Sequence, residues 1–158
     1  MKPRTTSQAV LGIVGWLVLT FAVALFGAQF EPGEWYASLD KPSWTPPSWL
    51  FGPVWTLLYA LMAVAAFLVW RQCGFTGARA ALSLFIAQLV VNGLWSWFFF
   101  GMHRIGLAFF DIIVLWFLIA ATIMAFYKLN KVAGWMLIPY LMWVSYAAGL
   151  NFALWRMN

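Results

Sequence analysis

Five apolar stretches of roughly membrane-spanning length follow one another along the chain and constrain its fold more than any other feature. They cover approximately residues 8–30, 54–70, 80–101, 105–127 and 132–155. A helix needs about 20 apolar residues to cross the roughly 30 Å hydrocarbon core of a bilayer. A membrane barrel would alternate polar and apolar residues, whereas the runs Phe98–Phe100 and Ile112–Leu115 are continuously apolar. We therefore predict an all-α integral membrane protein, in which residues 1–158 form one domain of five transmembrane helices.

Composition excludes several classes of protein and of chemistry. With 158 residues, 65% hydrophobic and 8% charged, the chain has too much apolar surface to bury in a water-soluble globule of this size. Cys73 and His103 are the single cysteine and histidine. A disulfide within the chain, a cysteine metal cluster and a convincing serine–histidine–acid set are therefore not expected, and no glycine-rich phosphate loop is present. We predict no metal site, no required cofactor and no conventional enzyme.

Basic residues are divided unequally between the two predicted sides of the membrane. The first apolar run is too long for a signal peptide and lacks a small-residue cleavage site before Glu31, so we predict that it is a retained helix. Six basic residues then share one side, and three lie opposite: Lys2, Arg4, Arg71, Arg79, Lys128 and Lys131 against Lys41, Arg104 and Arg156. This asymmetry predicts a cytoplasmic N-terminus. The net charge of +5 therefore does not indicate a nucleic-acid partner.

Between the first two apolar runs lies a segment rich in tryptophan and proline, residues 31–53, which we call the lid loop. It contains three of the four acidic residues of the chain, Glu31, Glu34 and Asp40. Three of its prolines restrict the central backbone, and three tryptophans offer large aromatic faces: Pro42, Pro46 and Pro47, with Trp35, Trp44 and Trp49. We predict a structured loop that covers a planar or amphipathic ligand.

The second apolar run, 54–70, carries Trp55 and Tyr59 one helical turn apart, so they share a face. Ordinary helix packing, with Trp55 in the aromatic belt at the membrane interface, explains this face, and so does the wall of a cavity. Spacing alone leaves both interpretations open.

The third run, 80–101, places Gln88 and Asn92 four residues apart, with Trp95 beside Asn92. Amide groups in lipid need hydrogen-bond partners, which neighbouring helices or a ligand can supply. In the fourth run, Asp111 lies a turn or two beyond Arg104. An acid within the membrane is a functional candidate by default, although it also serves to fix helices together.

The fifth run is interrupted by Pro139, which removes a backbone donor and predicts a bend in its first third. Beyond it, Trp143, Ala147 and Asn151 recur every four residues. An aromatic ring above small residues indicates either close helix packing or the floor of a pocket.

Several motifs together resemble the translocator protein family, also called the tryptophan-rich sensory protein or TspO/MBR family, which includes the peripheral-type benzodiazepine receptor. The first is W-Y-x-x-L-x-K-P-x-W-x-P-P, from Trp35 to Pro47, followed by W-x-x-x-Y at 55–59. A-Q-L-x-x-N-x-x-W at 87–95 and P-Y-L-x-W with A-x-x-L-N at 139–151 also match, as does Asp111. The resemblance covers essentially the whole chain.

This resemblance implies a five-helix membrane receptor or sensor, commonly a homodimer, that binds porphyrins such as protoporphyrin IX and haem, together with related hydrophobic ligands. Porphyrin would be a ligand and not a required cofactor. The implied ligand contacts come from the lid loop and three helices: Trp35, Trp55, Tyr59, Asn92, Trp95, Trp143 and Ala147. Gln88, Asp111 and Asn151, from the faces described above, complete the predicted site. Lys41 lies near its mouth, either pairing with a propionate or simply solvated.

Three further readings of the function follow. Light-dependent porphyrin degradation would use Trp35 and Trp143 as catalytic rings. A small transporter or exporter of tetrapyrroles or sterols would use Asp111 as a proton-coupled switch. A non-catalytic assembly subunit is the third alternative. Phe152 occupies the place of the tyrosine expected in the family's cholesterol motif, which argues against sterols. Without an organellar extension, we expect a bacterial cell membrane.

Overall fold

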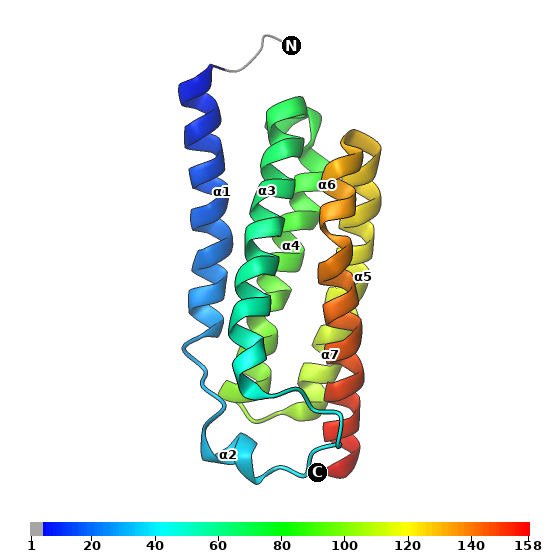
Figure 1. The fold of residues 1–158 in the computed structure, drawn as a ribbon. Helices are drawn as coiled ribbons and strands as arrows, with labels where there is room; N and C mark the ends of the chain where they lie inside the picture. Colours follow the sequence, from blue (N-terminus) through cyan, green and yellow to red (C-terminus); the bar gives the residue numbers. More distant parts are fainter. Residues whose placement is uncertain (1–4) are drawn as a thin grey trace.

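A computed structural model describes residues 5–158, and within these residues the secondary structure is entirely helical (Figure 1). Five helical segments are long and apolar enough to cross a membrane, which confirms the predicted fold class. The elements in chain order are α1 (Thr6–Gly27), α2 (Gly33–Ser38), the 3-10 turn η1 (Ser48–Leu50), α3 (Phe51–Gly77), α4 (Arg79–Ser96), the π-helical turn η2 (Trp97–Gly101), α5 (Ile105–Leu129), α6 (Lys131–Met136) and α7 (Ile138–Met157).

Helix ends differ from the apolar runs where polar residues continue a helix or a glycine breaks it. The segment predicted as 54–70 continues to Gly77, because Arg71 and Gln72 extend the helix beyond its apolar part. It kinks at Gly74, whose φ of 69° and ψ of −180° suit a residue without a Cβ. The last predicted segment is divided at Leu137, two residues before Pro139, so the predicted bend is present as a break between α6 and α7.

Polar side chains define several helix ends. The Thr5 hydroxyl accepts a hydrogen bond from the Gln8 amide, and the Gln8 side chain bonds back to Thr5, forming a capping box that starts α1. Asn130 caps α6 by accepting from the Ala133 amide. Its side-chain nitrogen also donates to Gln72 Oε1 at 3.0 Å, while Gln72 donates to the Leu129 carbonyl. These bonds join the end of α3 to the turn between α5 and α6.

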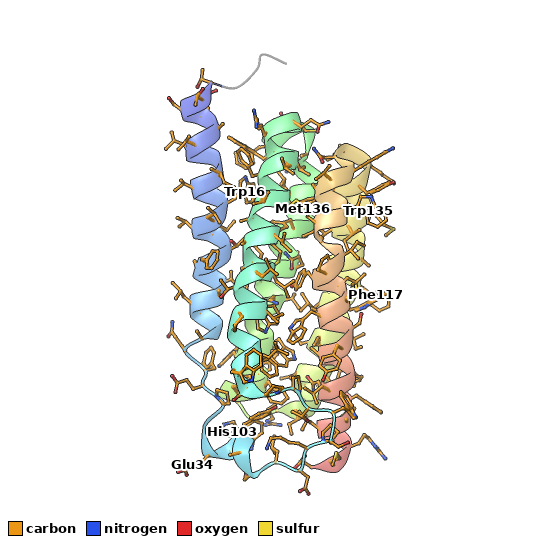
Figure 2. All side chains as sticks on the ribbon, in the orientation of Figure 1. Trp16, Glu34, His103, Phe117, Trp135 and Met136 are labelled. Carbon is orange, nitrogen blue, oxygen red and sulfur yellow. The ribbon has the colours of Figure 1, made fainter. Side chains whose placement is uncertain are left out.

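The long helices run side by side, with α1 at one edge of the bundle (Figure 1). Helix α1 packs against α3 and α4, α4 against α5, and α5 against α7. The main core joins side chains of all five spans, and a smaller core of Phe99, Ala108, Leu150 and Leu154 lies at the end nearest the lid loop. Large apolar side chains such as Phe117 and Trp135 project from the outer surface (Figure 2), where lipid would surround them.

The described basic residues divide between the two ends of the bundle as the sequence predicts. Arg71, Arg79, Lys128 and Lys131 lie at the end where α1 begins, whereas Lys41, Arg104 and Arg156 lie at the lid-loop end (Figure 1). Lys2 and Arg4 lie outside the described residues. The cytoplasmic placement of the N-terminus stays a prediction.

Candidate ligand-binding site

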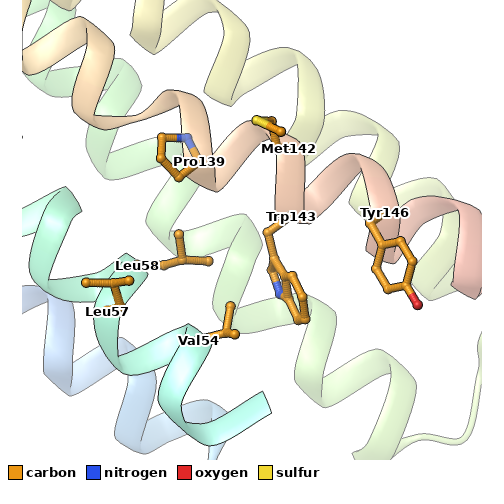
Figure 3. Close-up of a pocket in the computed structure, with 7 residues that line it drawn as sticks. All are labelled: Val54, Leu57, Leu58, Pro139, Met142, Trp143 and Tyr146. Atoms are coloured by element: carbon orange, nitrogen blue, oxygen red, sulfur yellow. The ribbon is translucent and has the colours of Figure 1, made fainter. Parts of the chain in front are cut away.

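A groove on the side of the bundle separates α3 from α7, and we call it the α3/α7 groove. Its volume is about 340 Å³, and it is lined by Val54, Leu57, Leu58, Pro139, Met142, Trp143 and Tyr146. The Trp143 ring extends from α7 across the groove toward Val54 (Figure 3). The Trp143 ring also meets the Phe51 ring, with 5.9 Å between their centroids. One predicted site residue, Trp143, therefore lines an open groove among apolar neighbours.

A buried cluster of polar side chains lies behind this groove and joins three helices. Tyr59 of α3 hydrogen-bonds to Asn92 Oδ1 of α4, and Asn92 Nδ2 donates to the Tyr140 hydroxyl of α7 at 3.1 Å. Tyr140 donates to Gln88 Oε1 at 2.9 Å, and Gln88 Nε2 faces Met62 Sδ at 3.8 Å. Tyr59, Gln88 and Asn92 are thus brought together, but their polar groups bind one another.

The groove and the polar cluster are back to back on the same two helices. Leu58 lines the groove and its neighbour Tyr59 enters the cluster, and Pro139 and Tyr140 are related in the same way. Consecutive helical residues point about 100° apart, so one helical turn can place one residue in the groove and the next in the polar cluster. Trp55 lies beside the cluster, with its ring 5.6 Å from that of Tyr59 and 6.2 Å from that of Tyr140.

A second polar contact lies nearer the lid loop. Trp95 Nε1 donates to Asn151 Oδ1 at 3.0 Å, and Asn151 Nδ2 donates to the Ile105 carbonyl at 3.0 Å. Asn151 is buried, and Trp95 and Ala147 pack against the core. These three predicted residues therefore take part in helix packing, which is one of the two interpretations that their spacing left open.

The lid loop is structured, as predicted, and it is attached to α7 at two places. The Tyr146 hydroxyl donates to the Trp44 carbonyl at 2.7 Å, and its ring lies 5.7 Å from the Trp44 ring. Farther on, the Asp40 amide donates to Asn158 Oδ1, and Asn158 Nδ2 donates to the Asp40 carbonyl, both at 3.0 Å. The loop thus passes beneath the end of the bundle and closes against its last helix (Figure 1).

Trp35 lies away from the α3/α7 groove. It belongs to α2, where its ring stacks on His103 at 4.2 Å with an interplanar angle of 12°, and it also meets Phe99 at 5.7 Å. His103, with a φ of 55°, lies in the turn before α5, near α2 (Figure 2). Among the ring contacts of residues 5–158, none joins Trp35 to Trp143.

The Lys41 side chain binds carbonyl groups at the end of α2 and does not line the groove. Its ammonium donates to the carbonyls of Ala37 and Leu39, both at 3.1 Å, and lies 4.8 Å from the centre of the Tyr36 ring. Burial, and to a smaller extent the neighbouring Tyr146, raises the pKa of Tyr36, so this ring stays neutral at physiological pH. The contacts of Lys41 are those of a helix-capping residue.

Asp111 is partly buried on α5, and its Oδ2 is buried without a hydrogen-bond partner among the described residues. It does not line the α3/α7 groove. An unsatisfied carboxylate oxygen is costly in a membrane span.

Several residues of the site were not predicted from the sequence. Tyr140 is a buried member of the polar cluster, and Leu58, Met142 and Tyr146 line the groove. A signal for two of them was available, because Tyr146 is three residues beyond Trp143 and Leu58 is three residues beyond Trp55. Tyr140, three residues before Trp143, carried the same signal, but its hydrogen-bond partners belong to another helix and could not be found from spacing.

A family model and several known proteins match nearly the whole chain. Residues 11–156 match the model of the TspO/MBR family. The tryptophan-rich sensory protein of Cereibacter sphaeroides is 44% identical over 147 residues, covering 90% of this chain and 91% of that protein. The translocator protein of Homo sapiens is 40% identical over 137 residues, covering 84% and 81%. Tryptophan-rich protein TspO of Archaeoglobus fulgidus is 40% identical over 151 residues, covering 96% and 97%. The likeness extends from α1 to α7.

Proposed function

The chain belongs to the TspO/MBR family, and on this premise we propose that it is a membrane receptor or sensor that binds porphyrins and related hydrophobic ligands in the α3/α7 groove. Relatives carry the names sensory protein and translocator protein. Protoporphyrin IX and haem are the proposed ligands, because the family resemblance implies a planar macrocycle and the groove offers an aromatic wall.

The observation that carries this proposal is the position of Trp143. Its indole ring crosses an apolar groove of about 340 Å³ and faces Val54 and Leu58 (Figure 3). This volume is at the lower end of the range of about 300–1,000 Å³ for ligand sites. The groove is open at the side, so a larger ring can insert one edge and extend outward. Apolar burial would supply about 25 cal/mol per Å², before the costs of binding are subtracted.

The polar cluster behind the groove supports ligand binding indirectly. Tyr59, Asn92 and Tyr140 satisfy one another across α3, α4 and α7. A ligand in the groove therefore meets the apolar side of α3 and α7, while the cluster fixes the distance between these helices. We assign Tyr59, Gln88 and Asn92 the role of positioning residues.

The proposal is tested by titrating protoporphyrin IX into the full chain in mild detergent and following tryptophan quenching and porphyrin absorbance. Leu57→Trp adds bulk at the groove, and Leu25→Trp adds the same bulk on α1; these leucines are 61% and 68% exposed. We expect Leu57→Trp to weaken binding by about tenfold or more, because it removes apolar contact worth at least about 1.4 kcal/mol. Leu25→Trp should bind like the parent. Equal binding by all three proteins, or no saturable quenching, would reject the groove as the site.

Light-dependent degradation of the bound porphyrin is an extension of this proposal. Trp143 lines the groove and is the ring placed to react, whereas Trp35 is stacked on His103 at the lid-loop end. We expect Trp143→Phe to slow porphyrin loss under illumination, and Trp35→Phe to change it little. Equal rates in the parent and in Trp143→Phe would remove this ring from the chemistry.

A transporter is the second candidate, and the unpartnered Asp111 oxygen favours it. An acid within a span can couple a proton gradient to movement of a substrate. In vesicles, porphyrin uptake that follows the proton gradient and disappears in Asp111→Asn would support transport. Uptake that is unchanged in this variant would leave Asp111 a structural residue.

A homodimer in a bacterial cell membrane completes the proposal. Light scattering of the purified chain, corrected for detergent, measures its oligomeric state, and a monomeric mass under all mild conditions would contradict the dimer.

A further inference from the structure

Met142 is the one methionine that lines the α3/α7 groove, and its side chain lies at the open edge of that groove. It is 68% exposed, which makes it the most exposed methionine of residues 5–158. Met62, in contrast, is fully buried, with its sulfur facing the Gln88 amide. Methionine suits surfaces that bind varied apolar ligands, because its unbranched side chain is flexible and polarisable. A ligand in the groove therefore contacts a thioether that is also open to the surroundings of the bundle.

Met142 lies near the middle of the groove wall that α7 forms. Pro139, Met142, Trp143 and Tyr146 make up this wall at spacings of three and four residues, so they share one face of the helix. At 1.5 Å per residue, the wall extends about 10 Å from Pro139 to Tyr146. Met142 and Trp143 lie next to each other on it (Figure 3). A ring that inserts one edge into the groove therefore lies close to the Met142 sulfur.

Two other oxidisable side chains flank Met142, but both are packed against further rings. The Trp143 ring lies 5.9 Å from the Phe51 ring and 5.8 Å from the Tyr146 ring. Tyr146 is 38% exposed, and its hydroxyl donates to the Trp44 carbonyl at 2.7 Å. Among the oxidisable side chains of the groove, Met142 is thus the most accessible to a small reagent that arrives from outside the bundle.

Singlet oxygen is such a reagent, and it forms where dioxygen meets an illuminated porphyrin. Dioxygen takes up the excitation energy without transfer of an electron. It is apolar and dissolves in hydrocarbon, so it reaches the open edge of the groove from the membrane. The thioether, singlet oxygen and one water molecule then give the sulfoxide and hydrogen peroxide. The sulfur loses two electrons, dioxygen gains them, and a new S–O bond converts an apolar side chain into a polar one.

The new sulfoxide oxygen would lie on an apolar wall. Leu57, Leu58 and Pro139 line the same groove, and none of them carries a side-chain hydrogen-bond donor. A polar group that a ligand covers without a hydrogen-bond partner weakens binding, because it loses its contact with water. Oxidation at position 142 therefore opposes the binding of the ligand that causes it.

From these observations we propose that Met142 is a site of light-driven oxidation. Porphyrin bound in the α3/α7 groove directs singlet oxygen to the Met142 thioether, and the sulfoxide then weakens porphyrin binding. Light and dioxygen thereby limit occupancy of the groove. This inference rests on the proposed function, because the porphyrin has to occupy the α3/α7 groove, but it does not require Trp143 to take part in porphyrin breakdown.

The first experiment illuminates the full chain with protoporphyrin IX in mild detergent and follows oxygen incorporation at each methionine by peptide mass spectrometry. Met124 of α5 is the matched control, because it is 61% exposed and does not line the groove. We expect Met142 to be oxidised about fivefold faster than Met124, because the source of singlet oxygen is bound beside it. Methylene blue, a cationic sensitiser in solution, should oxidise the two residues at similar rates, and illumination under argon should oxidise neither.

The second experiment uses glutamine at position 142 to imitate the polar sulfoxide. In the dark, Met142→Gln should bind protoporphyrin IX about tenfold more weakly than Met142→Leu. Met124→Gln and Met124→Leu should not differ from each other. If Met142→Gln does not fold, as judged by circular dichroism, the parent and Met142→Leu are illuminated, freed of spent porphyrin and titrated afresh. The parent should then lose affinity relative to its unilluminated sample, and Met142→Leu should not.

The possible failures separate this inference from the proposed function. Saturable binding in the dark, with Met142 and Met124 oxidised at the same rate, would overturn the inference and leave the porphyrin site in place. Equal affinities of Met142→Gln and Met142→Leu would show that a polar group at this position does not limit binding. An absence of saturable binding in the dark would reject both the porphyrin site and the role of Met142.

Discussion

The two sides of α3 are joined to the bundle by different chemistry. On the side of α4 and α7, buried hydrogen bonds of Tyr59, Asn92 and Tyr140 connect three helices. On the side of α1, the hydrogen bonds of the α1 side chains within residues 5–158 stay inside α1 and its cap, as for Thr20, which donates to the Leu17 carbonyl. Trp16 is the one apolar side chain that α1 buries, packing edge-on against Phe85 at 5.7 Å.

This difference matters in a membrane, because lipid surrounds apolar side chains as well as another helix does. Association of helices then depends on close packing and on hydrogen bonds between them. Helices α3, α4 and α7 use both, whereas α1, within residues 5–158, contacts the rest of the bundle by close packing, with Gly12 directly against the Trp70 ring. We infer that the first side has one fixed arrangement and that the second is easier to separate.

The largest expected effect comes from removing the centre of the polar cluster. Asn92→Leu abolishes two bonds between helices: the Tyr59 hydroxyl loses its acceptor, and the Tyr140 hydroxyl loses a donor but keeps its bond to Gln88. At about 0.6–1.7 kcal/mol for each bond, the loss of stability should approach about 3 kcal/mol. Thermal unfolding in detergent measures it, with Gln29→Leu, at an exposed position, as the control. A loss no greater than that of the control would mean that the cluster does not hold these helices together.

The next effect tests the packing of α1. A Cβ at Gly12 would lie 2.1 Å from the Trp70 ring, whereas a Cβ at Gly15 would meet nothing within 4 Å. Gly12→Ala should therefore destabilise the bundle by about 2 kcal/mol through overpacking. Gly15→Ala should be neutral or slightly stabilising, because alanine favours the helix. Unfolding of the two variants under identical conditions provides the comparison, and equal stability would contradict the close contact of α1 with α3.

A smaller effect is expected at the second polar contact. Trp95→Phe keeps an aromatic ring against Phe99 but removes the donor to Asn151. We expect a loss of about 1 kcal/mol, which is typical of one hydrogen bond between membrane helices. Trp97→Phe is the matched control, because this ring is 41% exposed and bonds to no other helix in the described part of the chain. Identical unfolding of the two variants would show that the Trp95–Asn151 bond adds nothing.

The smallest effect concerns the attachment of the lid loop. Tyr146→Phe removes the bond to the Trp44 carbonyl, which lies in an exposed environment. The global stability should fall by no more than about 1 kcal/mol. Hydrogen exchange of the amides near residue 45 should accelerate, because local opening becomes easier. Exchange that is unchanged would indicate that the Asp40–Asn158 contact alone holds the loop.

The sequence was sufficient to predict the membrane fold and some local features, but not which side chains meet between helices. Apolar length alone identifies the five spans, and Pro139 identifies the break before α7, because both depend on neighbours along the chain. Likewise, Gln88 and Asn92 were recognised as amides that need partners. The identity of those partners, Tyr59 and Tyr140, depends on how α3 and α7 are rotated against α4, and the sequence contains no periodic signal for that rotation.

The position of Trp35 shows the same limit in the lid loop. Its motif suggested a ligand contact beside Trp143, but the structure places it on His103. A proline-rich loop has no repeat from which its direction can be predicted. The assignment of Trp35 and Trp143 to one site therefore stays a prediction that the geometry does not support, and the roles of the other site residues await the measurements described above.

The bonds around Asn92 also have a direction. Protons are donated from Tyr59 to Asn92, from Asn92 to Tyr140, and from Tyr140 to Gln88, always in the same sense. Each member but the first accepts once before it donates, so position 92 needs an oxygen and an N–H on one short side chain. Aspartate has nearly the same shape, but in its ionised form it can only accept. It would force the Tyr140 hydroxyl to turn from Gln88 toward position 92 and would leave Gln88 without its donor, so similarity of shape alone does not make a substitution conservative here.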